Sequence, residues 1–131
     1  MRQGKINVAF RVLCDLYRIK GLPFGLSSML FNMKRALQPF VEHYNEAEAE
    51  VLEKWDAVTP AGTVRTDMPM ADVAQINKEL DDIRATEVEY NVKPITVVLT
   101  DELTEKLGIT GELIEQLDGI ICFEEKEDDE E

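Results

Sequence analysis

The chain has 131 residues, of which 44% are hydrophobic and 31% are charged, and its formal net charge is −13. This length suits one domain with a modest core, and no apolar run approaches the ~20 residues that a membrane-spanning helix needs. Arg11, Asp15 and Arg18 interrupt the apolar part of the N-terminal stretch, so we expect no secretory signal peptide.

The charge is divided unevenly along the chain. Residues 1–38 hold seven basic side chains and one acidic side chain, whereas residues 39–131 hold seven basic and 26 acidic side chains. The two parts therefore carry +6 and −19. Such a division can align subunits head to tail or steer a charged partner. The ordinary interpretation, which we favour, is that the basic part packs beside acidic segments of the same chain.

The first predicted element is a helix over residues 8–19. Ile6, Val8, Phe10 and Val12 alternate as in a strand, but the length of the segment, Asn7 as a candidate N-cap and Gly21 beyond its end favour a helix. The KGLPFGLSS segment that follows breaks the chain, because glycine permits positive φ and proline cannot continue a helix. Ser27 or Ser28 is the expected cap of the next helix.

A long helix is predicted over residues 26–57, because apolar residues recur there in steps of three and four. Pro39 lies inside it, removes one backbone hydrogen bond and conflicts with the carbonyl of Arg35. The helix should therefore bend or break near residues 35–39. Beyond this point its exposed face is expected to be acidic.

Residues 58–70 contain two prolines and no helical stripe, which indicates a loop with a short hairpin around Pro60-Ala61-Gly62. Helical periodicity returns over residues 71–86, with Asp67 or Asp72 serving the N-terminus as a cap or by its charge. Because the loop is short, this helix should run back along the long helix as a hairpin.

The C-terminal part predicts a small unit of strands and short helices. Apolar residues alternate over 88–92 and 95–99, which indicates one bent strand or two short ones. Thr100 and Thr110 are expected to cap two short helices, the first ending at Gly108. A turn at Asp118-Gly119 leads to a buried strand over residues 120–123, and the acidic residues 124–131 form a tail too polar to be ordered by burial.

Together these elements predict a mostly helical α+β fold. A bent hairpin of two long helices packs with the N-terminal helix, and the strand and short-helix unit closes one end. Residues 1–123 are predicted to form a single domain and residues 124–131 a disordered acidic tail.

The sequence offers little catalytic chemistry. His43 is the only histidine; Glu46 and Glu50 follow it at helical spacing and could share a metal ion, but a plain surface or boundary histidine is favoured. The carboxylate pairs Asp81-Asp82 and Asp101-Glu102 could bind a cation, although the second pair is better explained by the helix dipole. No phosphate-binding loop, nucleophile motif or zinc spacing occurs. We therefore expect no enzyme, no cofactor and no metal.

The two cysteines, Cys14 and Cys122, lie far apart and form no CxxC motif. We expect them to be reduced, buried thiols, with a disulfide between them as the less favoured alternative.

Two charged surfaces are possible binding sites. Five basic residues cluster near the first turn between helices, beside Tyr17 and Phe24; they are Arg11, Arg18, Lys20, Lys34 and Arg35. They could grip phosphates, but the overall charge makes direct nucleic-acid binding an unfavoured hypothesis. The acidic helix face could instead imitate a phosphate backbone, although solubility is the ordinary explanation of such acidity.

The order of these segments resembles small phage- and prophage-encoded proteins of unknown function. The matching pieces are Leu22-Pro23, Glu48 to Trp55, Gly62, Lys78-Glu79-Leu80, Glu87 to Val92 and Leu117 to Ile121. The resemblance covers nearly the whole chain, and its motifs are made of common residue types. It implies a small non-enzymatic accessory or assembly protein, in the cytoplasm of a bacterial host or associated with the virion.

The leading functional hypothesis is therefore a protein–protein interaction module with a phage or host partner and a potential for homo-oligomers, without membrane contact. The residues expected to bind the partner lie near the Pro39 bend, on the acidic helix face: Glu42, Glu46, Glu50 and Glu53. The alternative is an inhibitor that mimics nucleic acid and blocks a host defence or DNA-binding protein. A third class, a small metal-dependent enzyme, would require a divalent ion at His43 or Asp81-Asp82.

Overall fold

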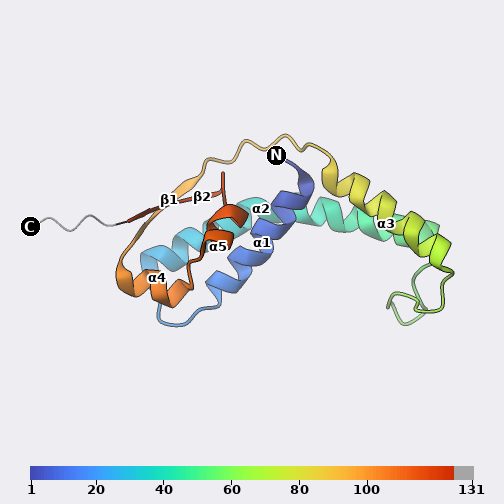
Figure 1. The fold of residues 1–131 in the computed structure, drawn as a ribbon, viewed down its shortest axis with the longest axis horizontal. Helices are drawn as coiled ribbons and strands as arrows, with labels where there is room; N and C mark the ends of the chain where they lie inside the picture. Colours follow the sequence, from blue (N-terminus) through green and yellow to red (C-terminus); the bar gives the residue numbers. More distant parts are fainter. Residues whose placement is uncertain (126–131) are drawn as a thin grey trace, which may run out of the picture.

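The computed structural model describes residues 1–125. Within that range the chain forms five helices and two strands, and the other elements pack along one long helix (Figure 1). Their bounds are α1 Gln3–Tyr17, α2 Phe24–Lys54, α3 Met70–Ala85, β1 Ile95–Leu99, α4 Asp101–Leu107, α5 Gly111–Gln116 and β2 Ile121–Glu125. The predicted fold class, mostly helical α+β with a small strand unit, is confirmed.

Helix α1 begins five residues earlier than its sequence pattern predicted. Its N-cap is Arg2, which provides no side-chain cap, so the prediction of Asn7 as the cap was wrong. Asn7 lies inside the helix and accepts a hydrogen bond from Gln3 Nε2 at 2.9 Å. The early start is stabilised by a distant segment, because the Gln3 backbone N–H donates to the carbonyl of Thr86 at 3.0 Å.

Helix α2 starts at Phe24 with Pro23 as its N-cap, so neither Ser27 nor Ser28 caps it as predicted. Both serines lie in the first turns, where the Ser27 N–H already donates to the Pro23 carbonyl at 3.0 Å. The helix passes through Pro39 without a break, and Figure 1 shows one continuous ribbon that curves along its length. The sequence predicted that the helix would either bend or break near Pro39, and the break does not occur.

Helix α3 returns along the C-terminal half of α2 and forms the predicted hairpin (Figure 1). The connecting loop contains the expected tight turn, with a bridge between Val58 and Val64 and positive φ at Gly62. Asp67 does not cap α3, because the N-cap is Pro69 and the Asp67 carboxylate instead pairs with Arg65. Asp72 lies in the first turn, where its negative charge interacts favourably with the helix dipole, as predicted.

The C-terminal unit is built around a two-stranded parallel sheet. Strand β1 pairs with β2 in a register that places Ile95 opposite Ile121. Thr100 and Thr110 cap α4 and α5 as predicted, each accepting from a backbone N–H at 3.2 Å. Gly108 ends α4 in the left-handed conformation, which glycine adopts without steric cost.

Two predictions for this unit were wrong. Residues 88–92 run extended but form no strand, although Val88, Tyr90 and Val92 pack against the core. Their alternation therefore reflects burial on one side and not pairing in a sheet. Strand β2 continues to Glu125, two residues into the segment predicted as a tail; the remainder, residues 126–131, lies outside the described residues.

The apolar side chains form two clusters of unequal size. The large cluster joins α1, the N-terminal half of α2 and the C-terminal unit, and 15 of its residues are buried. The small cluster joins the C-terminal half of α2 to α3 and has three buried residues, Ala57, Ile76 and Leu80. Cys14 is half-buried and Cys122 is exposed, and both are free thiols. The prediction that Cys122 is buried was therefore wrong, because the two-stranded sheet is covered on only one face.

Candidate interaction surface

The acidic row of α2, which we define as Glu42, Glu46, Glu50 and Glu53, lies on one exposed face of the helix. All four side chains are exposed. At 3.6 residues per turn their positions fall within about 80° of one another around the helix axis. Opposite them, Leu37 and Tyr44 are buried against the rest of the protein. The sequence pattern predicted both the exposure of the row and its shared face.

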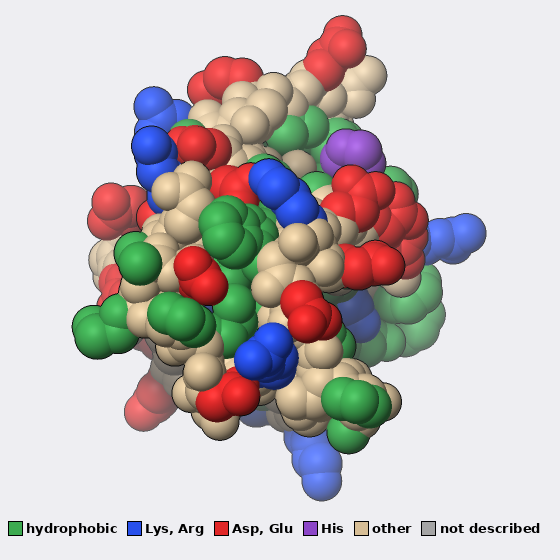
Figure 2. All heavy atoms as spheres, turned by 90° about the vertical axis from the view of Figure 1, so that its right-hand side faces the viewer, with side chains coloured by type: hydrophobic (Ala, Val, Ile, Leu, Met, Phe, Trp, Pro, Cys, Tyr) green, Lys and Arg blue, Asp and Glu red, His purple; other side chains and the backbone are tan. Residues whose placement is uncertain are grey.

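The carboxylates of the acidic row are not compensated by basic side chains. In the part of the chain that the structure describes, none of the four is in a salt bridge, and the one polar contact is from Gln38 Nε2 to Glu42 at 3.0 Å. Two acids of the neighbouring helix α3 do have basic partners: Glu79 pairs with Lys54 at 2.7 Å, and Asp81 pairs with Arg84 at 2.9 Å. Figure 2, viewed from the α2–α3 end, shows more acidic than basic side chains at this end of the molecule.

The N-terminal half of α2 presents a different surface on the same side. Phe24 is 87% exposed, and Phe31 is 43% exposed. Phe31 stacks in a tilted arrangement on Tyr17 of α1 at a centroid distance of 5.9 Å, and Lys34 Nζ lies 5.4 Å from the Tyr17 ring centre. Arg35 is exposed beside them. We call Phe24, Phe31 and Arg35, together with Tyr17 and Lys34, the aromatic–basic patch.

Sequence reasoning identified the basic residues and two of the aromatic residues of this patch but missed Phe31. The signal that could have found it is the spacing on α2. Phe24, Phe31 and Arg35 are separated by seven and four residues, which places them on one line of a helix. The buried stripe at Leu26, Leu30, Met33 and Leu37 occupies the opposite side.

The structure does not bring the histidine and the paired acids together into one cluster. No group of three His, Cys, Asp or Glu side chains among residues 1–125 is placed to hold a metal ion. His43 is exposed on α2 and lines a hollow of about 280 Å³ between α2 and the end of α3. Asp81 is engaged with Arg84, whereas Asp101 and Glu102 lie in the first turn of α4.

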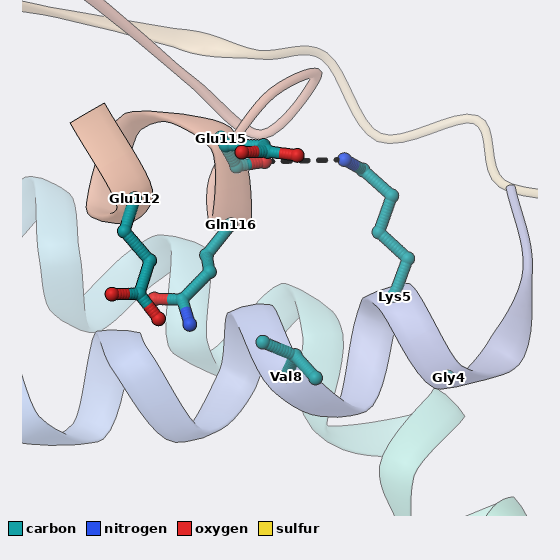
Figure 3. A pocket seen from close by; sticks show the side chains of 6 residues that line it. All are labelled: Gly4, Lys5, Val8, Glu112, Glu115 and Gln116. Atoms are coloured by element: carbon teal, nitrogen blue, oxygen red, sulfur yellow. Dashed lines mark hydrogen bonds between the residues drawn. The ribbon is translucent and has the colours of Figure 1, made fainter.

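A larger hollow lies between α1 and α5, with a volume of about 520 Å³. Lys5 reaches across it to the Glu115 carbonyl at 3.5 Å, while Glu112 and Gln116 line its other side (Figure 3). The hollow is wide and open, and its charged lining residues are Lys5, Glu112 and Glu115.

The ionisable groups whose pKa values are displaced by their surroundings include a glutamate of α3 and two tyrosines. Hydrogen bonds from Lys54 and then Trp55 hold the pKa of Glu79 below its usual range. Burial raises the pKa of Tyr44, and its hydrogen bond to Glu48 raises it further. Burial also raises the pKa of Tyr90, whose hydroxyl is buried without a hydrogen-bond partner in the described part of the chain. These groups lie at packing contacts, which explains the shifts without catalysis.

Comparisons with known proteins give no family for this chain: no protein-family model, no curated protein and no solved structure matches it. Among the described residues, no helix is both long enough and apolar enough to cross a membrane.

Proposed function

We propose that this protein is a non-enzymatic interaction module that binds a protein partner through the acidic row of α2. The observation that carries the proposal is the row itself, four exposed carboxylates without basic partners in the described residues. For the biological role of the protein, we propose the phage-type accessory or assembly role that the sequence resemblance implies.

The row does not benefit the helix that carries it. Glu42 and Glu46 lie four residues apart, as do Glu46 and Glu50. Like charges at this spacing destabilise a helix by about 0.2–0.5 kcal/mol per pair. A solubilising surface could place its charges in mixed pairs and avoid this cost. The uncompensated arrangement is better explained by a partner whose basic side chains neutralise it.

The chemistry of the row defines the partner. The helix presents its carboxylates over about three turns, a length of roughly 16 Å between the first and last Cα atoms. This arrangement fits a basic groove or a helix with Lys and Arg on one face. Such electrostatic complementarity chiefly sets specificity and association rate.

The test is a pull-down with the tagged full chain from infected or lysogen-carrying cells, followed by mass spectrometry. The test variant replaces all four row residues with Gln, which keeps the side-chain size and the helix propensity. The matched control replaces Glu89, Glu105, Glu112 and Glu115, all exposed elsewhere, with Gln. We expect the control to capture the same partner and the test variant to lose it. Equal capture by both variants would show that the acidic row is not the binding site.

A second candidate function is inhibition of a DNA-binding protein by imitation of nucleic acid. The spacing favours it, because steps of four residues separate successive carboxylates by about 6 Å along the helix axis. An inhibitor of this kind should lose potency steeply with added salt. Inhibition of a basic nuclease or repressor, measured between about 0.05 and about 0.3 M salt, distinguishes this candidate from an assembly role. Recovery of virion proteins in the pull-down would favour assembly instead.

A further inference from the structure

The outer face of α2 carries a basic residue and an acidic residue at nearly equal distances from its middle. The helix runs from Phe24 to Lys54, so Pro39 is its central residue with fifteen residues on either side. Phe24, Phe31 and Arg35 lie on one side of the centre, and Glu42, Glu46 and Glu53 lie on the other. The spacing of these six residues is seven, four, seven, four and seven, which keeps them within about 60° around the helix axis.

We propose that two copies of this chain associate through this face, with their α2 helices antiparallel and a two-fold axis between Gln38 and Pro39. A two-fold interface requires a surface that complements itself. In this register Arg35 of each copy lies opposite Glu42 of the other. Phe31 lies opposite Glu46, and Phe24 lies opposite Glu53. The inference rests on the proposed function, since it gives one carboxylate of the acidic row, that of Glu42, a definite basic partner on a second copy.

The face is open for such a contact. In the described part of the chain α1, α3 and β1 all pack against α2, yet Arg35, Gln38, Pro39 and Glu42 at its centre are exposed. In the remaining positions Ser28 would lie opposite Ala49, each Asn32 opposite the other copy's Asn45, and Glu50 opposite Ser27. No position of the outer face sets two like charges against each other in this register.

Charge favours this antiparallel register over a parallel pair in which identical residues face each other. A parallel pair would place Arg35 opposite Arg35 and Glu42 opposite Glu42, which is repulsive. The net charge of −13 per copy opposes association at long range, but at about 0.15 M salt charges more than about 8 Å apart are largely screened while contacting pairs are not. A helix about 46 Å long gives an interface below the standard size, so the dimer should be weak and reversible.

The test is sedimentation velocity of the full chain from about 10 to about 500 µM in about 0.15 M salt. We expect a concentration-dependent shift from monomer to dimer. Arg35→Glu and Glu42→Arg each convert both central pairs into repulsive pairs, so each variant should raise the dissociation constant by roughly tenfold or more. Far-UV circular dichroism and urea midpoints establish that each variant is folded.

Mixing the two variants tests the geometry directly. A mixed dimer of Arg35→Glu with Glu42→Arg restores two attractive pairs, so association should return. The matched controls carry the same charge changes at exposed positions outside the face, Lys93→Glu and Glu112→Arg. Each control alone should dimerise like the parent chain. In a mixture of Arg35→Glu with Glu112→Arg, only the Glu112→Arg chain should dimerise, with itself, because a mixed dimer keeps one repulsive pair.

Two outcomes would overturn the inference: a monomer at every concentration, or a dimer that both single variants leave unchanged. Neither outcome decides the proposed function, because Arg35→Glu retains the acidic row. This variant is used as a second bait in the pull-down. If it captures a heterologous partner, the interaction module stands without the dimer. If the row variant and the parent chain capture the same proteins, the proposed function fails whatever the sedimentation result.

Discussion

The two halves of α2 pack into apolar clusters of very different size. The N-terminal half lies in the large cluster with α1 and the C-terminal unit, where Leu13, Leu30 and Leu37 are almost completely buried. The C-terminal half shares the small cluster with α3 alone. Since local stability follows the number of buried apolar contacts, one continuous helix here joins a firmly held core to an end that should open more readily.

This difference matters for the candidate surface. The acidic row lies on the C-terminal half of α2, which packs in the small cluster, and the aromatic–basic patch lies on the N-terminal half, which packs in the large cluster. The like charges of the row add to the weakness of their region. A partner that neutralises the row would therefore also stabilise the hairpin end, since a ligand that binds the folded state shifts the equilibrium towards it.

The largest expected effect on the free energy of unfolding is in the large cluster. Leu37→Ala removes a fully buried side chain from the large cluster and should lower the free energy of unfolding by about 3–4 kcal/mol. Urea denaturation followed by circular dichroism measures it. Ile114→Ala is the control, because Ile114 is 44% exposed and should lose far less. A loss at Leu37 no larger than the loss at Ile114 would contradict the assignment of the core.

A smaller and more local effect is expected at the hairpin end. Leu80 is buried in the small cluster, and Leu80→Ala should cost about 2 kcal/mol. Because few other contacts hold α3, the opening should be confined to this end. Hydrogen exchange read by mass spectrometry should accelerate across residues 70–85 and stay unchanged in residues 3–17. Equal acceleration in both segments would show that the two regions unfold as one unit.

Two tyrosines allow a matched comparison of hydroxyl groups. The Tyr44 hydroxyl donates to Glu48 at 3.0 Å, so Tyr44→Phe should cost about 1 kcal/mol. The Tyr90 hydroxyl is buried without a partner in the described residues, and Tyr90→Phe keeps the ring that packs on Phe40 at 5.7 Å. That variant should leave stability unchanged or raise it by up to about 1 kcal/mol.

The measurement is again urea denaturation, with both variants compared in the same buffer. A clear loss at Tyr90 would mean that its hydroxyl has a partner in solution, such as an ordered water. An additional check is the ultraviolet titration of the tyrosines, in which Tyr90→Phe should remove a component that ionises above the ordinary pKa of tyrosine.

Features with local causes were predicted from the sequence. Thr100 and Thr110 cap their own helices, and Gly108 ends one in the left-handed conformation. Each depends on residues within one turn of it, so the information is present in a short segment. The exposure of the acidic row is local in the same sense, because it follows from the 3.6-residue period of α2.

Features with distant causes were not predicted. The start of α1 depends on the Thr86 carbonyl, which is 83 positions away from Gln3. The segment at residues 88–92 alternates like a strand but has no partner strand in the described chain, and alternation cannot distinguish burial from pairing. The aromatic–basic patch was found only in part, because the exposure of Phe31 depends on what packs around α2 and not on its own sequence neighbours.

The smallest expected effect is a change in the stability of the hairpin end at low pH. Lys54 and Trp55 donate hydrogen bonds to Glu79 and lower its pKa in the folded state. A carboxyl with a lowered folded pKa stabilises the fold above its unfolded pKa, which is near 4.3, and this contribution is lost as the pH falls through the folded pKa. The hairpin end should therefore loosen in acid before the large cluster does.

Trp55 is the only tryptophan, so its fluorescence between about pH 7 and about pH 2 reports directly on this contact. We expect an emission change in the parent chain that Glu79→Gln removes, because glutamine does not titrate. Glu105→Gln is the control, since Glu105 is exposed on α4, away from the tryptophan, and it should leave the transition in place. Superimposable transitions for the parent chain and Glu79→Gln would show that the acid response comes from other carboxylates. In that case the weakness of the hairpin end would come from its small apolar cluster and not from its charges.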